Sequence, residues 1–209
     1  QYFSAWPSPP AWRDGRHVME HGSSMSVDGL SSSRLLRFSL RDLRSWTNDF
    51  DASCRIGKGS SASVYHAVDA SGTSYAVKVV QSRGENAQRQ FENEVNALVQ
   101  FRHPNIVPLI GYYFEDNQSG LVYELLQRGN LIACLADDVS TPLSWEDRVR
   151  IAVGVARGLH FLHNARSQPC FHRDVKSANI GLSDQCAAKL LDCGLAFFGG
   201  KGEAAEGGD

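Results

Sequence analysis

The sequence HRDVKSAN, which begins at His172, constrains this chain more than any other feature. Asp174 can accept a proton from a hydroxyl group, and Lys176 can offset negative charge on a phosphoryl group. Asn179, together with Asp192 in a DCG turn that follows, carries the hard oxygen ligands that Mg²⁺ prefers. The order and spacing of these residues therefore indicate phosphoryl-transfer chemistry.

A lysine interrupts an apolar run, YAVKVV, that is typical of a strand. Lys78 must bury its aliphatic stem there and find an anion for its ammonium group. A phosphate or a carboxylate would serve, and Glu94, beside Val95 on a predicted helix, is a candidate carboxylate. The alternative is a solvated glutamate that pairs with a nearby arginine. These residues alone leave both readings open.

A glycine-rich stretch precedes this lysine, with Gly57, Gly59, Ala62 and Val64 between two predicted strands. A dinucleotide-binding fingerprint needs a strand before it and a helix after it, so the hairpin context favours a cover for phosphates. Glycines suit that role because side chains would keep backbone amides away from a triphosphate. A tight turn is the alternative. The glycines, the lysine, the glutamate and the HRDVKSAN loop in this order make coincidence a poor explanation.

Hydrophobic periodicity predicts a small strand-rich lobe followed by a helical one. One amphipathic helix should carry Phe91, Val95 and Leu98 on one face, and Ser144 with Asp147 forms a capping box for a second. The predicted strands span 55–68, 73–80, 106–114 and 119–125, and the helices span 84–101 and 144–163.

Three flanking segments are predicted around the main domain. Residues 1–33 hold proline, glycine and serine without an apolar period, so they should form a disordered tail. Residues 34–50 should be a short helical lead-in, because Ser39 and Asp42 form a capping box. Residues 197–209 are rich in glycine and glutamate and should form a second disordered tail.

Composition narrows the partners and the compartment. The net charge of -2 and the pI near 6.4 offer no basic footprint for nucleic acid or an anionic membrane. Five cysteines lie singly, without a CxxC pair, as in cytosolic proteins with reduced thiols. No stretch approaches about 18 consecutive apolar residues, so no membrane span is expected in this chain. The chain begins with Gln1 rather than with Met, so it can be part of a longer protein with a membrane span upstream. We therefore expect either a cytoplasmic protein or the cytoplasmic part of a membrane receptor.

From about Phe38 to Ala196 the chain resembles the protein kinase branch that contains the interleukin-1 receptor-associated kinases, Pelle and the plant receptor-like kinases. The resemblance is carried by FSLRDLRSWTNDF, FENEVNALVQFRHPNIVPLIGYY, LVYELLQRGNL, LSWEDRVRIAVGVARGLHFLH and FHRDVKSANI. It implies an α+β, two-lobed protein kinase fold over 51–196. The N-lobe, about 51–124, would be an antiparallel sheet with a regulatory helix, and about 129–196 would form an incomplete helical C-lobe.

The resemblance implies roles for the catalytic residues. Lys78 looks like the lysine that holds the α- and β-phosphates, and Glu94 looks like its ion-pair partner. Asp174 would be the catalytic base, and Lys176 after it is similar to serine/threonine kinases. The implied cofactors are ATP and Mg²⁺, with the metal held by Asn179 and Asp192.

The resemblance also implies a nucleotide pocket and partners. Tyr123 looks like the residue that gates the back pocket, while the carbonyl of Glu124 and the amide of Leu126 would hold the adenine edge. The remaining ATP-binding residues would be Ile56, Gly57, Gly59, Ala62, Val64 and Ala76. The implied partners are a protein substrate and an upstream receptor or adaptor.

Several positions depart from the family pattern. Ala62 replaces a glycine and Ser61 an aromatic residue, changes that a nucleotide loop can tolerate. Gly181 stands where the family has a leucine under the adenine, so nucleotide binding should be weakened, and a leucine there should strengthen it. Cys193 replaces the phenylalanine of the magnesium turn, so we expect a looser switch.

After Asp192 and Cys193 the sequence continues only with GLAFFGGKGEAAEGGD. This segment contains neither the activation segment nor the later helices of the family. We therefore expect a serine/threonine kinase ancestry with absent or impaired transfer in this chain. The first alternative is a pseudokinase-like module that binds a nucleotide or a partner in receptor signalling. The second alternative is an incomplete sequence whose functional form has the missing helices.

Overall fold

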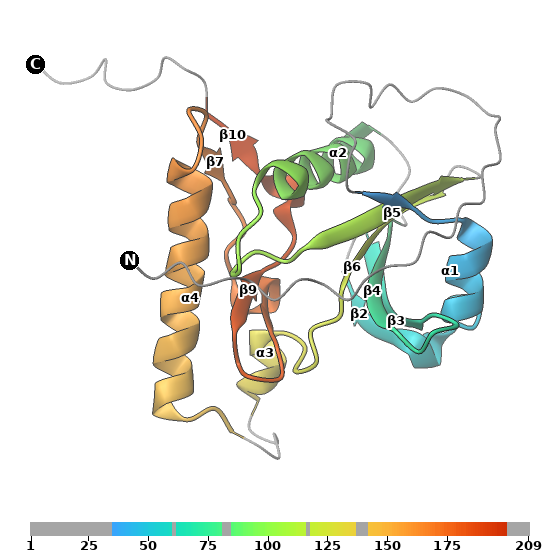
Figure 1. Cartoon of the computed structure of the whole chain (residues 1–209), viewed down its shortest axis with the longest axis horizontal. Helices are drawn as coiled ribbons and strands as arrows, with labels where there is room; N and C mark the ends of the chain where they lie inside the picture. The colour runs from blue at the N-terminus through green and yellow to red at the C-terminus, as the bar shows by residue number, and fades with distance from the viewer. Residues whose placement is uncertain (1–34, 60–61, 81–84, 116–117, 137–141, 200–209) are drawn as a thin grey trace, which may run out of the picture. The chain divides into compact units, whose positions relative to one another are not determined.

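The computed structural model describes residues 35–59, 62–80, 85–115, 118–136 and 142–199 (Figure 1). The predicted tail at 1–33, most of the one at 197–209, and Ser61 lie outside these residues. Within the described part, a strand-rich portion comes first and a mainly helical portion follows, as the sequence predicts.

A six-stranded sheet dominates the first portion, in the order β1-β5-β6-β4-β3-β2. β2 to β6 pair antiparallel, which confirms the predicted sheet. β1 adds a parallel edge strand beside β5 that the sequence did not indicate. The strands are β1 (Leu36–Arg37), β2 (Arg55–Lys58), β3 (Ala62–Val68), β4 (Ser74–Val80), β5 (Leu109–Glu115) and β6 (Gln118–Glu124).

The segment before the sheet packs against the sheet face opposite to Lys78. α1 (Leu40–Trp46) begins at Ser39, whose hydroxyl accepts the N–H of Asp42 over 3.0 Å. Its buried leucines pack against the β4 residues Tyr75 and Val77. β1 can approach β5 closely because position 111 is glycine, where a Cβ would overlap the carbonyl of Leu36. A short 3₁₀ turn, η1 (Ala52–Cys54), then leads into β2.

α2 (Glu85–Gln100) follows the central strands. Phe91, Val95 and Leu98 are buried, as their spacing predicts, and Glu94 is buried beside them. β5 starts at Leu109 rather than at the predicted 106, because Ile106 forms a bridge with Leu190 instead. The backbone at Ile106 therefore pairs with β9 (Ala188–Leu190) of the second portion and connects the two portions of the described structure.

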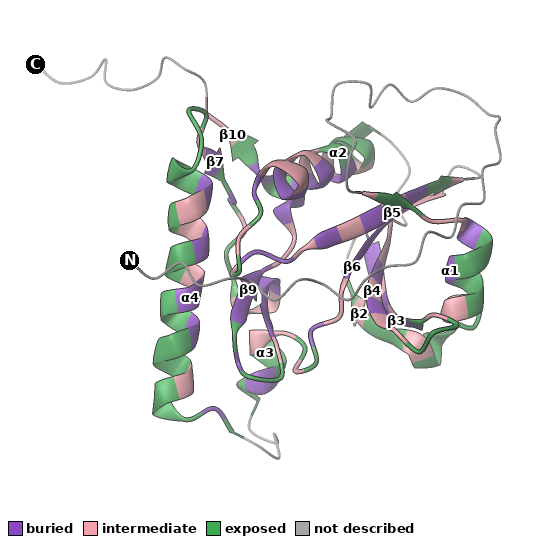
Figure 2. Ribbon diagram, in the orientation of Figure 1, coloured by how far each residue is buried: buried purple, intermediate pink, exposed green. Residues whose placement is uncertain are grey.

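The second portion is built around α4 (Trp145–Asn164), which Ser144 caps through the N–H of Asp147 over 3.1 Å. One face of α4 is buried against β9, and the opposite face is exposed (Figure 2). The sequence reading missed the short helix α3 (Leu131–Cys134). The remaining elements are β7 (Cys170–Phe171), η2 (Ser177–Asn179), β8 (Ile180–Leu182), β9 (Ala188–Leu190), η3 (Cys193–Leu195) and β10 (Phe197–Phe198).

The predicted disordered tail at 197–209 is wrong for its first residues. Phe197 and Phe198 form β10 and pair antiparallel with β7. The centroid of the Phe198 ring also lies 6.2 Å from the centroid of the Phe101 ring. Glycine and glutamate dominate only the residues beyond this pair, so averaging over the whole segment hid two aromatic side chains with packing partners.

Candidate active site

One face of the sheet gathers residues predicted to bind nucleotide. Lys78 pairs with Val64 across β4 and β3, and Ala76 pairs with Tyr123 across β4 and β6. Residues paired across neighbouring strands share a face, as do residues two positions apart on one strand. These four side chains therefore line the same face, whereas the alternate residues of β4 pack towards α1.

The rest of the predicted nucleotide surface comes from the β2–β3 hairpin. Ile56 on β2 is exposed, and Gly57 lies opposite Val64. The N–H of Gly59 donates to the carbonyl of Ala62 over 2.8 Å, which keeps the two strands together at the edge of the described hairpin. Gly57 is thus paired with Val64, which is itself paired with Lys78, so the glycine-rich hairpin lies next to the strands that carry Lys78.

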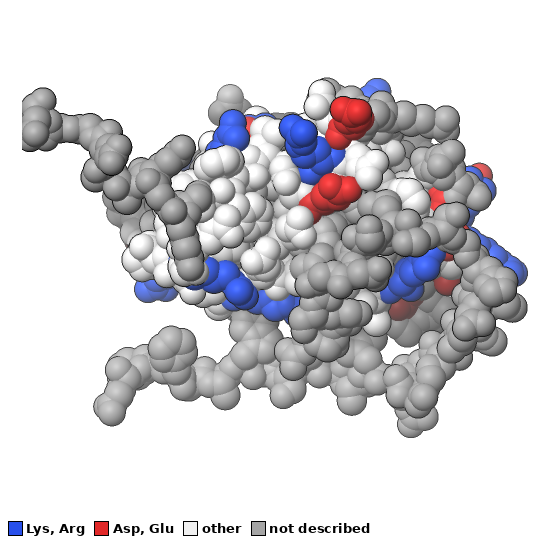
Figure 3. Space-filling view, turned by 90° about the horizontal axis from the view of Figure 1, so that it is seen from above, with Lys and Arg blue, Asp and Glu red and all other residues white. Residues whose placement is uncertain are grey.

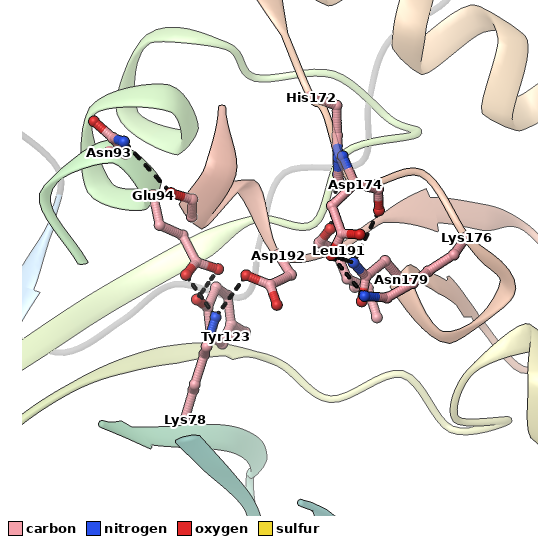
Figure 4. Close-up of polar contacts among 11 residues, drawn as sticks. Lys78, Asn93, Glu94, Tyr123, His172, Asp174, Lys176, Asn179, Leu191 and Asp192 are labelled. Carbon is pink, nitrogen blue, oxygen red and sulfur yellow. Dashed lines mark hydrogen bonds and ion pairs between the residues drawn. The ribbon is translucent and has the colours of Figure 1, made fainter. Parts of the chain in front are cut away.

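Lys78 lies between two carboxylates from distant parts of the chain (Figure 4). Its Nζ donates to Oε2 of Glu94 over 2.7 Å and to Oδ1 of Asp192 over 2.8 Å. The predicted ion pair between Lys78 and Glu94 is therefore present, and the alternative of a solvated glutamate is excluded, since Glu94 is 2% exposed. The hydroxyl of Tyr123 donates to the other oxygen of Glu94 over 2.6 Å, a contact that the sequence did not predict.

The charges in this cluster stabilise one another. Burial alone would lower the pKa of Lys78, but the carboxylates of Glu94 and Asp192 raise it above its usual range. Burial would raise the pKa of Asp192, and the ammonium group of Lys78 outweighs this and lowers it. Burial and the negative charge of Glu94 raise the pKa of Tyr123 well above its usual value. At neutral pH Lys78 is therefore a cation, Asp192 an anion and Tyr123 a neutral phenol.

Asp174 lies in a second group of contacts (Figure 4). Lys176 donates from Nζ to its Oδ2 over 2.7 Å, and Asn179 donates from Nδ2 to the same oxygen over 2.8 Å. Asn179 also donates to the Asp174 carbonyl over 2.9 Å. Among the described residues both side-chain donors meet Oδ2, and neither of these hydrogen bonds involves Oδ1.

A buried histidine connects the loop to the turn before Asp192. His172 is 1% exposed, and its Nδ1 accepts the N–H of Asp174 over 3.3 Å. Nε2 then carries the ring proton and donates to the Leu191 carbonyl over 2.8 Å. Arg173 (φ 65°) and Asp192 (φ 57°) both adopt the left-handed conformation, which is costly for residues other than glycine. The histidine bonds help to hold this strained backbone in place.

The segment between the two portions contributes two contacts that sequence reasoning missed. Lys189 of β9 donates from Nζ to Oε2 of Glu124 over 2.9 Å. The side chain of Leu126 packs onto Gly181 of β8. Lys189 lies between apolar residues on a strand, as Lys78 does, so the same signal could have identified it as a lysine that needs an anion.

Cys193, at the predicted switch position, lies in η3 and is fully buried. η3 packs against α2, and Asn93 of α2 donates to the carbonyl of Gly194 over 3.4 Å. Burial raises the pKa of the Cys193 thiol above its usual range and raises that of Cys170 to about 11. Both thiols are therefore protonated at neutral pH.

Alkylation of the folded chain at pH 7.5 should accordingly be selective. All five cysteines are free, but only Cys54 is not buried. We expect a maleimide to modify Cys54 first, and the four buried thiols only after unfolding, because thiolate character and access control the rate. Peptide mass spectrometry at timed intervals measures this order. Equal labelling of Cys193 and Cys54 in the folded chain would contradict the described packing of η3.

Comparison with known proteins agrees with this geometry. Residues 50–206 match the family described as protein kinase domain. The chain is similar to the calcium/calmodulin-regulated receptor-like kinase 1 of Arabidopsis thaliana, with 39% identity over 88% of this chain and 41% of that protein. It is likewise 39% identical to the probable serine/threonine-protein kinase PBL8 of the same plant, over 94% of this chain and 47% of the relative.

The receptor-like protein kinase HERK 1 of Arabidopsis thaliana is a third relative, at 36% identity over 86% of this chain and 22% of that protein. The chain thus spans less than half the length of these relatives. The family match covers most of the chain, and the relatives agree with the branch that the sequence resembles. The chain therefore belongs to the protein kinase family.

Proposed function

We propose that this chain binds MgATP and transfers the γ-phosphoryl group to the hydroxyl of a serine or threonine in a protein. The observation that carries the proposal is the arrangement of Lys78 between Glu94 and Asp192. A lysine held in this way presents a fixed cation to a phosphate without moving when the ligand binds. The contacts of Asp174 with Lys176 and Asn179 add a base whose position is also fixed.

The nucleotide would lie along the sheet face that carries Val64, Ala76 and Lys78. In this proposal the adenine edge meets the carbonyl of Glu124 and the amide of Leu126 at the end of β6, and Tyr123 closes the pocket behind it. The bond from Tyr123 to Glu94 supports this role, because it ties the back of the pocket to the residue that positions Lys78.

The glycines of the β2–β3 hairpin support a phosphate-covering role. Gly57 and Gly59 do not have a left-handed φ, and a Cβ on either would meet described neighbours only at ordinary distances of 3.5 Å. Neither backbone conformation nor packing among the described residues therefore requires glycine at these two positions. Close approach of a triphosphate to the backbone amides would require it.

The residues proposed to hold Mg²⁺ fit its chemistry. Asn179 donates its amide N–H groups to Asp174, which leaves its side-chain carbonyl oxygen as an acceptor. Asp192 is ionised, because Lys78 lowers its pKa. A neutral amide oxygen and a carboxylate are hard ligands of the type that the ion takes. When bound, Mg²⁺ would neutralise charge on the phosphates.

The acceptor and the setting are further parts of the proposal. The printed name of PBL8 specifies a serine/threonine kinase, and Lys176 after Asp174 supports the same specificity here. On the face shown in Figure 3, the Lys and Arg side chains lie in separate groups among acidic and uncharged ones, which suits a protein partner better than a polyanion. In the described ranges no helix has the length and apolarity needed to cross a bilayer. We propose a cytoplasmic setting and an upstream receptor or adaptor.

The transfer assay that tests this function uses the 209-residue chain with γ-labelled MgATP and mixed peptides that offer serine, threonine or tyrosine. We expect label on serine and threonine, and its loss in Lys78→Met, which removes the cation but keeps the apolar stem. The sequence also predicts that this chain transfers phosphate slowly or not at all, and the rate of labelling in the same assay tests that prediction. Binding of MgATP without transfer to any peptide would favour the pseudokinase-like alternative. Tyrosine as the preferred acceptor would overturn the specificity proposed.

A further inference from the structure

Residue 181 has no side chain, and the space beside it is filled from the segment after β6. A Cβ built on Gly181 would overlap Cδ1 of Leu126 and would lie 3.1 and 3.2 Å from the two δ-carbons of Leu191. Leu126 itself is only 9% exposed. The side chain of Leu126 therefore occupies the volume that a side chain at 181 would need.

Backbone hydrogen bonds hold this segment against β8. The N–H of Leu182 donates to the Gly129 carbonyl over 2.8 Å, and the N–H of Arg128 donates to the Leu182 carbonyl over 3.2 Å. Gly129 (φ 69°) donates its own N–H to the Leu126 carbonyl over 3.0 Å, which closes a turn that suits glycine. The backbone around Leu126 is thus fixed relative to Gly181.

We propose that Leu126 supplies the apolar surface beneath the adenine ring, in place of the side chain that residue 181 lacks. The inference rests on the proposed nucleotide function, in which the Leu126 amide meets the adenine edge. A bound aromatic ring needs apolar contact on both faces. Val64 and Ala76 would cover one face from the sheet, and Leu126, backed by Leu191, would cover the other.

Positions 126 and 181 then act as one unit. Only one of them can place a large side chain in the shared volume, because Leu191 bounds it on the other side. The expectation that a leucine at 181 alone would strengthen binding is therefore revised, since it would displace Leu126 from its place. Substitutions at the two positions should be strongly non-additive.

Titration calorimetry of the chain tests this with two probes, MgATP and magnesium tripolyphosphate, which lacks the base. Leu126→Ala should raise the Kd for MgATP about tenfold, the effect of losing one well-buried apolar side chain. Gly181→Leu alone should also weaken MgATP binding. The double variant Leu126→Ala with Gly181→Leu should return to within about threefold of the parent, because a leucine again fills the volume.

The tripolyphosphate probe separates a base-contacting role from a structural one. Its Kd should stay within about twofold of the parent in all three variants, whereas general damage to the fold would weaken both probes. Ile132→Ala, an exposed position on α3, serves as the matched control and should bind both probes like the parent. Leu126→Ala with parental MgATP affinity, or a double variant no tighter than Leu126→Ala, would overturn this inference alone. A parent chain that binds no MgATP would overturn it together with the proposed function.

Discussion

Replacing Glu94 with alanine should lower the free energy of unfolding by about 3 kcal/mol, the range for breaking a buried ion pair on one side. Glu94 is 2% exposed, and it accepts hydrogen bonds from both Lys78 and Tyr123. Its removal leaves the Tyr123 hydroxyl without this acceptor and leaves Asp192 as the one carboxylate partner of Lys78 within the described part of the chain. For a chain of this length the melting temperature should fall by roughly 6 to 12 °C.

Two further variants show whether charge or hydrogen bonding carries this effect. Glu94→Gln keeps the shape and one accepting oxygen but replaces the other oxygen with an NH2 donor, so it should cost less than alanine and more than no change. Glu92→Ala lies on the same helix but is exposed, and it should shift the melting temperature by less than about 2 °C. Calorimetric melting of the four proteins gives the comparison. Equal shifts for Glu92→Ala and Glu94→Ala would mean that the buried cluster contributes little.

The part of the site that the sequence predicted is the part set by local chemistry. A lysine in an apolar strand must find an anion, and this requirement made Lys78 a candidate with Glu94 as one possible partner, while the resemblance indicated the ion pair itself. Asp174 and Asn179 lie in one short loop, so their proximity follows from the backbone. Asp192 was predicted from the DCG turn that follows this loop, and its bond to Lys78, which was not predicted, connects the Lys78–Glu94 pair to that turn.

The contacts that were missed depend on how separate strands pack. The Tyr123 hydroxyl meets Glu94 only because the fold brings this residue of β6 within reach of α2, and the spacing of the two residues in the sequence does not predict that distance. The packing beside Gly181 was not predicted for the same reason. The side chain of Leu126, a residue distant in the sequence, occupies the space next to this glycine, and a single position could not reveal that contact. Weakened nucleotide binding, expected from the missing side chain, stays a prediction.

The fold shows the same division between local and long-range information. Capping at Ser39 and Ser144 was predicted because the cap and its partner lie three residues apart. The parallel pairing of β1 with β5 was not, because it depends on a glycine at 111 that lets one backbone approach another. A glycine inside a strand pattern is a sign of such close approach, but it does not say which segment approaches.

The last prediction concerns Asp174, whose replacement by asparagine should lower the rate of phosphoryl transfer by about 10²- to 10⁴-fold. The amide can keep an oxygen near Lys176 and Asn179, so the loop should hold its shape, but it cannot take the proton of a serine or threonine hydroxyl. Asp174 contacts Asn179, a proposed metal ligand, but the bond from Asn179 to the Asp174 carbonyl is unchanged by the substitution, and Asp174 contacts neither Lys78 nor the proposed adenine pocket. The Kd for MgATP should therefore change by less than about threefold. A single-turnover assay, with enzyme in excess over labelled ATP, makes slow transfer measurable.

Asp184→Asn is the matched control for this variant, because Asp184 is exposed in the turn between β8 and β9. Among the described residues its carboxylate accepts only the N–H of the neighbouring Gln185, over 2.8 Å. The same chemical change there should leave the transfer rate within about twofold of the parent. If Asp174→Asn instead transferred phosphate within about fivefold of the parent rate, Asp174 would not be the base. The fixed cation at Lys78 and the bound metal would then account for most of the rate, and the acceptor proton would leave by another route.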